Sequence, residues 1–207
     1  MLTIWGRANS LNVQKVMWCL AELGVPCRRI DVGMQYGGND TPEFLAKNPN
    51  GRVPVLEEES GFTLWESNTI VRYLAAKHGA GRLWPADPAR RADSERWMDW
   101  QITTVDRPLF TVFWGLVRSP AEKRDMKAIE AARDALGDLW KIADARLADR
   151  PYLGGDTLTI GDIPLGAVAH RWFNLPIDLP SCPNVEGWYK RLGERAPYRS
   201  HVMLPLS

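Results

Sequence analysis

A proline at the entrance of a predicted strand restricts the fold of this chain more than any other feature. It lies in the segment Asn50-Gly-Arg-Val-Pro-Val-Leu56, where Pro54 has no N–H group to give to a neighbouring strand and belongs at an edge or at a strand's first position. The backbone groups of Val53 are then left for a ligand. This segment predicts a site that binds a small peptide through main-chain hydrogen bonds.

A second segment, Trp65-Glu-Ser-Asn-Thr-Ile70, passes from a short strand into a helix. Apolar residues at positions 70, 71 and 74 recur there at helical spacing. The N–H groups at a helix start attract a carboxylate, and Glu66 beside Ser67 could hold an ammonium group. The pair therefore suits the zwitterionic end of an amino acid, and an N-cap without a ligand is the alternative.

The order of the periodic segments predicts two domains. Strands are expected at 2–5, 28–32, 53–57 and 63–65 and helices at 13–23, 42–46 and 67–77, which is the βαβαββα order of a thioredoxin-like α/β domain. A Gly- and Pro-rich stretch follows, and then a long helix from 89 to about 117, bent at Pro108, and another from about 120 to 148. We therefore expect a thioredoxin-like domain at 1–80, a linker at 81–88 and an all-α domain at 89–207.

A capping box is predicted within the second domain. In Leu158-Thr-Ile-Gly-Asp-Ile163 the Thr159 hydroxyl can accept from the N–H of Asp162, whose carboxylate can bond back, while Leu158 and Ile163 close the helix start as a hydrophobic staple. This is a folding signal and carries no chemistry. On this basis, replacing Asp162 by alanine costs about 1 kcal/mol, or somewhat more if the helix start is buried.

Charge and hydropathy exclude several classes of partner. With 26 basic and 25 acidic residues the net charge is +1, so no attraction to nucleic acid or to an anionic membrane is predicted. No stretch approaches the ~20 apolar residues of a membrane span, and the first residues do not resemble a signal peptide. We expect a cytoplasmic protein.

The cysteines and histidines predict neither a disulfide framework nor a metal site. Cys19, Cys27 and Cys182 are odd in number and lack C-x-x-C spacing, which favours reduced thiols. The three histidines are scattered along the chain without partners nearby in sequence. No metal is therefore predicted.

The two motifs together resemble those of the cytosolic glutathione transferases, and the resemblance extends along the whole chain. The first turn, residues 7–15, is most similar to bacterial transferases of the nu type, in which a hydroxyl residue, an asparagine two positions on and a lysine stand at the first helix. The resemblance implies glutathione as cosubstrate. It also implies that the Val53 backbone pairs with the cysteinyl unit, that Pro54 is a cis-proline, that Glu66 and Ser67 hold the γ-glutamyl end, and that the loop of Asn39 reaches the glycyl end. Arg52 could pair with a carboxylate of glutathione, and the alternative is that it faces water.

The chemistry of such an enzyme depends on lowering the thiol pKa of glutathione. One hydrogen bond to a charged group contributes roughly 1.5–3 kcal/mol, enough to lower that pKa by ~1–2 units. Ser10 and Asn12 are the candidate catalytic donors, because both lie where the first helix begins. Ser10 is the preferred donor, with Asn12 sharing the role. Both are also ordinary N-cap residues, which is the alternative.

The electrophile is expected to bind where the first helix of the second domain faces the thiol. Thr103, Arg107 and Phe110, spaced by four and three, share one face of that helix and are predicted to form the mouth of the pocket. The predicted function is glutathione transfer to a hydrophobic electrophile, in detoxification. A glutathione-dependent disulfide-bond reductase and a non-catalytic glutathione-binding or docking module are the alternatives.

A two-fold homodimer is also expected. The resemblance implies that the thioredoxin-like domain of one subunit packs on the helical domain of the other. Charged residues on helices expected to face that seam are mixed with apolar neighbours, as an isologous contact requires; they are Arg72, Arg90, Arg91 and Glu95.

Overall fold

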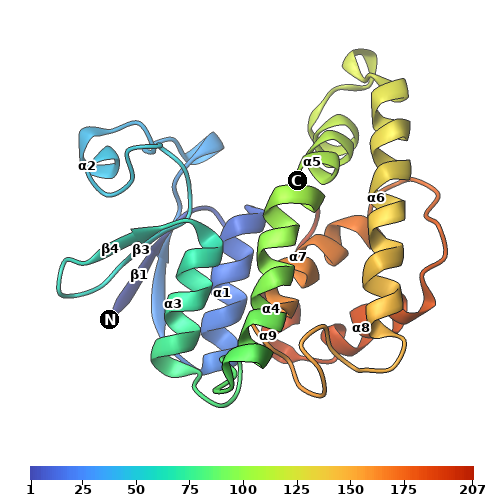
Figure 1. Ribbon diagram of the computed structural model, residues 1–207. Helices are drawn as coiled ribbons and strands as arrows, with labels where there is room; N and C mark the ends of the chain where they lie inside the picture. Colours follow the sequence, from blue (N-terminus) through green and yellow to red (C-terminus); the bar gives the residue numbers. More distant parts are fainter.

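A four-stranded mixed sheet stands on one side of the computed structural model, which describes residues 1–207, and a group of helices on the other (Figure 1). The strands are β1 (Leu2–Trp5), β2 (Cys27–Ile30), β3 (Val55–Glu57) and β4 (Thr63–Trp65). Their order is β2-β1-β3-β4, with β1 parallel to β2 and β3 antiparallel to both of its neighbours. Ile4 lies opposite Arg29 on one side and Leu56 on the other.

Three helices belong to the sheet region: α1 (Leu11–Leu23), α2 (Pro42–Leu45) and α3 (Ser67–His78). Helix α1 connects the parallel pair β1 and β2 and packs against α3. It ends at Gly24, whose φ of 69° is the left-handed conformation that glycine adopts without steric cost. The predicted βαβαββα order and the thioredoxin-like domain are confirmed.

Six helices make up the rest of the chain: α4 (Pro88–Trp100), α5 (Asp106–Phe113), α6 (Met126–Leu147), α7 (Asp162–Phe173), α8 (Pro183–Gly193) and α9 (Ala196–His201). Helix α7 is buried along almost its whole length and packs against α1, α4 and α8 (Figure 1). It therefore joins the helical region to the sheet region. None of the helices is both long and apolar enough to span a lipid bilayer.

The long helix expected from 89 to about 117 is interrupted twice. Segments of π-helix, Gln101–Val105 and Trp114–Arg118, separate α4 from α5 and end α5. Pro108 lies just after the first of them, and its nitrogen cannot donate to the carbonyl of Thr104. A wider π turn immediately before such a residue accommodates the missing bond. The irregularity expected at Pro108 thus lies in the turn before the proline.

The helix predicted from about 120 is shorter than expected. Residues Ala121–Lys123 form a 3-10 turn, and α6 begins at Met126. Asp125 fixes this start, because its carboxylate accepts from the Ala128 N–H at 3.0 Å.

The two regions share one apolar core, and polar contacts cross between them. The indole of Trp18 on α1 meets the ring of Tyr198 on α9 edge to face, with centroids 4.8 Å apart. Trp18 also donates to Glu22 at 2.9 Å, and Glu22 accepts two bonds from the guanidinium of Arg195 at 2.6 and 2.7 Å. Asn68 on α3 donates to the carbonyl of Met98 on α4 at 2.7 Å.

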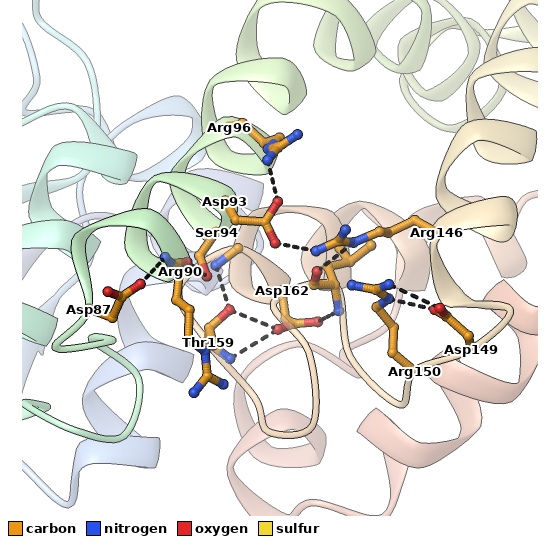
Figure 2. Close-up of polar contacts among 12 residues, drawn as sticks. Asp87, Arg90, Asp93, Ser94, Arg96, Arg146, Asp149, Arg150, Thr159 and Asp162 are labelled. Carbon is orange, nitrogen blue, oxygen red and sulfur yellow. Dashed lines mark hydrogen bonds and ion pairs between the residues drawn. The ribbon is translucent and has the colours of Figure 1, made fainter.

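The Asp162 carboxylate at the start of α7 is fully buried and accepts four hydrogen bonds, of which Figure 2 shows those from Thr159. One oxygen accepts from the Thr159 N–H at 3.0 Å and its hydroxyl at 3.2 Å; the other accepts from the Leu153 N–H at 2.8 Å and the Trp188 indole at 3.0 Å. Burial raises the pKa of Asp162 to about 6, so it is ionised at neutral pH.

The carboxylate half of the predicted capping box is therefore present, and the hydroxyl half is wrong. The N–H of Asp162 donates to the Thr159 carbonyl at 3.1 Å, and the Thr159 hydroxyl accepts from Gly161 instead, at 3.3 Å. The reason is that the Thr159 carbonyl already accepts from the Asp162 N–H, so the hydroxyl is left to bond Gly161 and the Asp162 carboxylate. Figure 2 also shows Arg146 on α6 between Asp93 on α4 and the Leu153 carbonyl, so the loop before α7 is tied to two helices.

Candidate active site

A cavity of about 340 Å³ lies between the two regions. The sheet region contributes the first turn and the loops that follow β2 and α2, and the helical region contributes α5, the π segment after it and α7. The lining of this cavity includes six of the residues predicted to bind glutathione or the electrophile: Ser10, Asn12, Asn39, Arg52, Val53 and Phe110.

Ser10 is the N-cap of α1 and is only 6% exposed, yet its hydroxyl makes no capping hydrogen bond. The carbonyl of Ser10 accepts from Gln14 at 2.9 Å, so the backbone begins the helix without the side chain. A buried hydroxyl facing a cavity and without a partner is available to a ligand. The ordinary capping role considered above is therefore absent.

Asn12 lies two residues after Ser10, in the first turn of α1, and contacts Ser67. The Ser67 hydroxyl at the start of α3 donates to Asn12 Oδ1 at 3.1 Å. This bond uses the amide oxygen and leaves the Asn12 NH₂ group to donate toward the cavity. The starts of α1 and α3, separated by more than fifty residues in sequence, are thereby linked at one point.

The segment around Val53 offers free backbone groups. The peptide bond between Val53 and Pro54 is cis, and neither the N–H nor the C=O of Val53 is hydrogen-bonded within the protein. Buried Asn48 supports this segment by donating to the Arg52 carbonyl at 2.7 Å, and Asn39 donates to the Gly51 carbonyl at 2.9 Å. Asn39 thus braces the loop as well as lining the cavity.

Glu66 has a left-handed backbone, with φ 71° and ψ 109°, which costs a non-glycine residue about 1–3 kcal/mol. Such strain is retained where the surrounding structure fixes it, often at a binding site. Neither Glu66 nor Ser67 lines the cavity itself. Ser67 reaches it through Asn12, and the Glu66 side chain is exposed.

On the helical side the cavity wall differs from the expectation. Asp106, Leu109 and Phe110 line it, whereas Thr103 and Arg107 lie outside. Thr103 donates instead to the Asp99 carbonyl at 2.9 Å. The π segment Gln101–Val105 is the physical reason, because its wider turn changes the phase of the residues that follow. Of the three residues that a regular 3.6-residue period places on one face, only Phe110 lines the cavity.

Lys15 begins a buried polar chain that the sequence did not indicate. It is 1% exposed, and its Nζ donates to Gln101 Oε1 at 2.6 Å; Gln101 Nε2 in turn donates at 3.1 Å to Asp106, which lines the cavity. Burial lowers the pKa of Lys15 to about 8, although the carboxylates of Asp106 and Glu66 oppose the shift. The only signal in the sequence was the lysine that forms part of the resemblance in residues 7–15.

Family models match both parts of the chain. The glutathione S-transferase N-terminal domain matches residues 1–76, and the C-terminal domain of the same family matches residues 126–191. The chain is also 45% identical over 208 residues to the glutathione S-transferase GstB of Escherichia coli, covering all of both chains. The chain belongs to the glutathione S-transferase family. The predicted family, fold and enzyme class are thereby confirmed.

Solved structures agree with this membership. The chain has the glutathione S-transferase fold and is similar to the structure of a theta class glutathione S-transferase from Xanthomonas axonopodis pv. citri with glutathione bound. The TM-score is 0.96 and the sequence identity 48%, and the match covers 100% of this chain and 99% of the other. The chain is also 29% identical, over 91% of its length and 88% of the other, to the disulfide-bond oxidoreductase YfcG of Escherichia coli.

Further features of this glutathione S-transferase chain bear on its chemistry. All three cysteines are free, and none lies in the first turn. No group of three or more His, Cys, Asp or Glu side chains is placed to hold a metal ion. Three arginines that the sequence analysis left unassigned also line the cavity; they are Arg7, Arg118 and Arg171.

Proposed function

We propose that the protein binds glutathione along Val53, stabilises its thiolate at the start of α1 and transfers it to an electrophile on the α5 side of the cavity. One observation carries the proposal: the buried Ser10 hydroxyl faces the cavity and caps no helix N–H. The sulfur forms a bond to the electrophilic atom, and the leaving group departs with its bonding electrons. We place this reaction in detoxification in the cytoplasm, where thiols such as Cys19 stay reduced.

The remaining contacts with glutathione follow from free donors and acceptors. The unpaired backbone groups of Val53, next to cis Pro54, suit the cysteinyl unit. Ser67 and Glu66 at the start of α3 suit the amino-acid end, since helix N–H groups attract its carboxylate. Arg52, exposed at the cavity rim near Asn39, suits the glycyl carboxylate. Phe110 supplies an apolar wall for the electrophile.

Ser10→Ala should raise the thiol pKa of bound glutathione by about 1–2 units, because a single hydrogen bond to an anion contributes roughly 1.5–3 kcal/mol. An ultraviolet titration of the thiolate measures this pKa in the enzyme and in the variants Ser10→Ala and Asn12→Ala. A shift in Asn12→Ala alone would make Asn12 the donor. No shift in either variant would exclude both side chains and leave the helix end and backbone N–H groups as the stabilising charge.

Disulfide-bond reduction is the second candidate, favoured by the similarity to YfcG and by the absence of a cysteine from the first turn. The glutathione sulfur would then attack a disulfide, forming a mixed disulfide while the other sulfur leaves as thiolate. Kinetics with 1-chloro-2,4-dinitrobenzene, a small disulfide and an organic peroxide separate the two reactions. Binding of glutathione without turnover of any of them would instead indicate a docking module.

A homodimer is the proposed assembly. Arg72 on α3 pairs with Glu95 at 3.3 Å and with Asp99, both on α4. These ion pairs hold α3 and α4 together on the surface that we expect to face the partner subunit. Light scattering at micromolar concentration should give twice the 23.4 kDa chain mass. Arg72→Glu should weaken the dimer, and Arg133→Glu, a half-buried arginine of α6 that pairs with the adjacent Asp134, should not. A mass of one chain for the unmodified protein would exclude the dimer.

A further inference from the structure

The cavity carries an excess of positive charge that acidic side chains of the protein do not neutralise. Its lining includes the guanidinium groups of Arg7, Arg118 and Arg171, and Arg52 lies at its rim. Asp106 is the one carboxylate in the lining, and it already accepts a hydrogen bond from Gln101. None of these arginines forms an ion pair with an acidic side chain.

Arg171 on α7 is the most deeply placed of them. It is 8% exposed, and its only hydrogen bond is to the carbonyl of Asn9, at 3.1 Å from Nη2. Its guanidinium lies 3.9 Å from the centre of the Phe113 ring. A buried guanidinium normally has a carboxylate or several acceptors around it, because removing its charge from water is costly. Here most of its donors are left over.

Arg118 stacks on the same aromatic surface. Its guanidinium lies 5.2 Å from the centres of both the Phe113 and Trp114 rings, and it donates to the backbone oxygen of Ser207, the last residue of the sequence, at 3.0 and 3.3 Å. Stacking on a ring holds a guanidinium flat and directs its N–H groups outward along the edge. Two guanidiniums on neighbouring rings thus present donors from the helical side of the cavity.

Arg7 completes the positive surface from the first turn. Its Nε is buried without a hydrogen-bond partner. Burial and the charge of Arg118 lower the pKa of Arg7, and burial with the same neighbour lowers the pKa of Arg171 to about 9. All three arginines remain charged at neutral pH, and their mutual repulsion is relieved when an anion enters.

An apolar wall lies beside these charges. Phe110 and Trp114 are 60% and 40% exposed, and their rings stack with centroids 5.2 Å apart. The stacked pair can hold a flat apolar or aromatic body, while the guanidinium edges can hold an oxyanion attached to it.

We propose that the electrophile conjugated by this enzyme carries a carboxylate or a similar oxyanion, which Arg171 and Arg118 hold while its apolar body lies on Phe110 and Trp114. This inference rests on the proposed transferase function and specifies its second substrate. Arg171 and Arg118 come from the helical region, whereas the groups suited to glutathione come from the sheet region. The two arginines therefore act on the electrophile and Arg52 on glutathione.

A matched pair of substrates tests the proposal. 4-Chloro-3,5-dinitrobenzoate and 4-chloro-3,5-dinitrobenzamide share a ring and a leaving group and differ in charge. In both, the glutathione sulfur bonds to the ring carbon and chloride leaves with its electron pair. The kcat/KM of each substrate is divided by the rate constant of its spontaneous reaction with glutathione. This ratio should be at least about tenfold higher for the benzoate, because one charge-assisted hydrogen bond contributes about that much.

Substitutions assign the effect to its residues. Arg171→Met and Arg118→Met should each lower kcat/KM for the benzoate by about 10–100-fold and for the benzamide by less than about threefold, with the KM for glutathione unchanged. Arg52→Met should instead raise the KM for glutathione with both substrates. Arg28→Met, on the exposed side of β2, is the control and should change neither.

Inhibition by benzoate tests the same site without a variant. Benzoate should compete with the electrophile and not with glutathione, and benzamide should inhibit far less. Equal turnover of the benzoate and benzamide substrates, together with equal inhibition by benzoate and benzamide, would exclude the proposed preference for an anionic electrophile. The proposed transferase function would not be affected by that result. Turnover of neither substrate, nor of 1-chloro-2,4-dinitrobenzene, would overturn the transferase function itself.

Discussion

Asp162→Ala should lower the free energy of unfolding by about 3–5 kcal/mol, the range for leaving buried partners of a charged group unpaired. The carboxylate is fully buried and holds the Leu153 and Thr159 N–H groups, the Thr159 hydroxyl and the Trp188 indole. Each buried donor left without an acceptor costs about 1–3 kcal/mol. Local relaxation, or a water molecule that enters the space, should offset part of the total loss of stability. Urea unfolding at pH 7 measures the loss.

Two further variants make this result specific. Asp162→Asn keeps one acceptor oxygen and should lose less than Asp162→Ala. Asp138→Ala removes an exposed carboxylate of α6 that pairs only with Lys141 and should change stability by less than about 0.5 kcal/mol. A loss of about 1 kcal/mol for Asp162→Ala would mean that the residue acts as an ordinary helix cap.

The difference between this figure and the capping estimate shows what local sequence can and cannot predict. Thr159 and Asp162 are three residues apart, so their mutual contact follows from the pattern. Trp188 and Leu153 lie on other segments, and only folding brings their donors to the same carboxylate. The sequence therefore identified the residue and underestimated its energetic role.

The candidate site has one side that local sequence patterns mark and one side that they do not. Ser10, Asn12 and Val53 were found because the sheet region builds its side of the cavity from short turns with clear local signals. Arg171 lies in a helix whose residues are nearly all buried, so no amphipathic pattern marks it. Asp106 was not considered and Arg107 was predicted in the pocket, because the π segment before them cannot be read from hydrophobic spacing.

Lys15→Met should abolish a pH dependence of stability that the buried ammonium creates. The pKa of Lys15 falls from 10.5 to about 8 on folding, because burial penalises the charge. Between these two values the unfolded chain binds more protons than the folded one, so the Lys15 contribution to stability increases with pH. Well below pH 8 the folded protein carries the full free-energy cost of burying the charge, about 3.5 kcal/mol for a shift of about 2.5 pKa units.

The measurement is the difference in unfolding free energy between the unmodified protein and Lys15→Met at pH 7, 8, 9 and 10. A difference is needed because burial also raises the pKa values of Cys19 and Tyr198, which destabilise both proteins alike as pH rises. The difference should change by less than about 0.5 kcal/mol from pH 7 to 8 and then rise in favour of the unmodified protein by about 2 kcal/mol by pH 10. Parallel profiles would show that Gln101 and Asp106 compensate the charge of Lys15 fully, and that its pKa is not lowered in the folded protein.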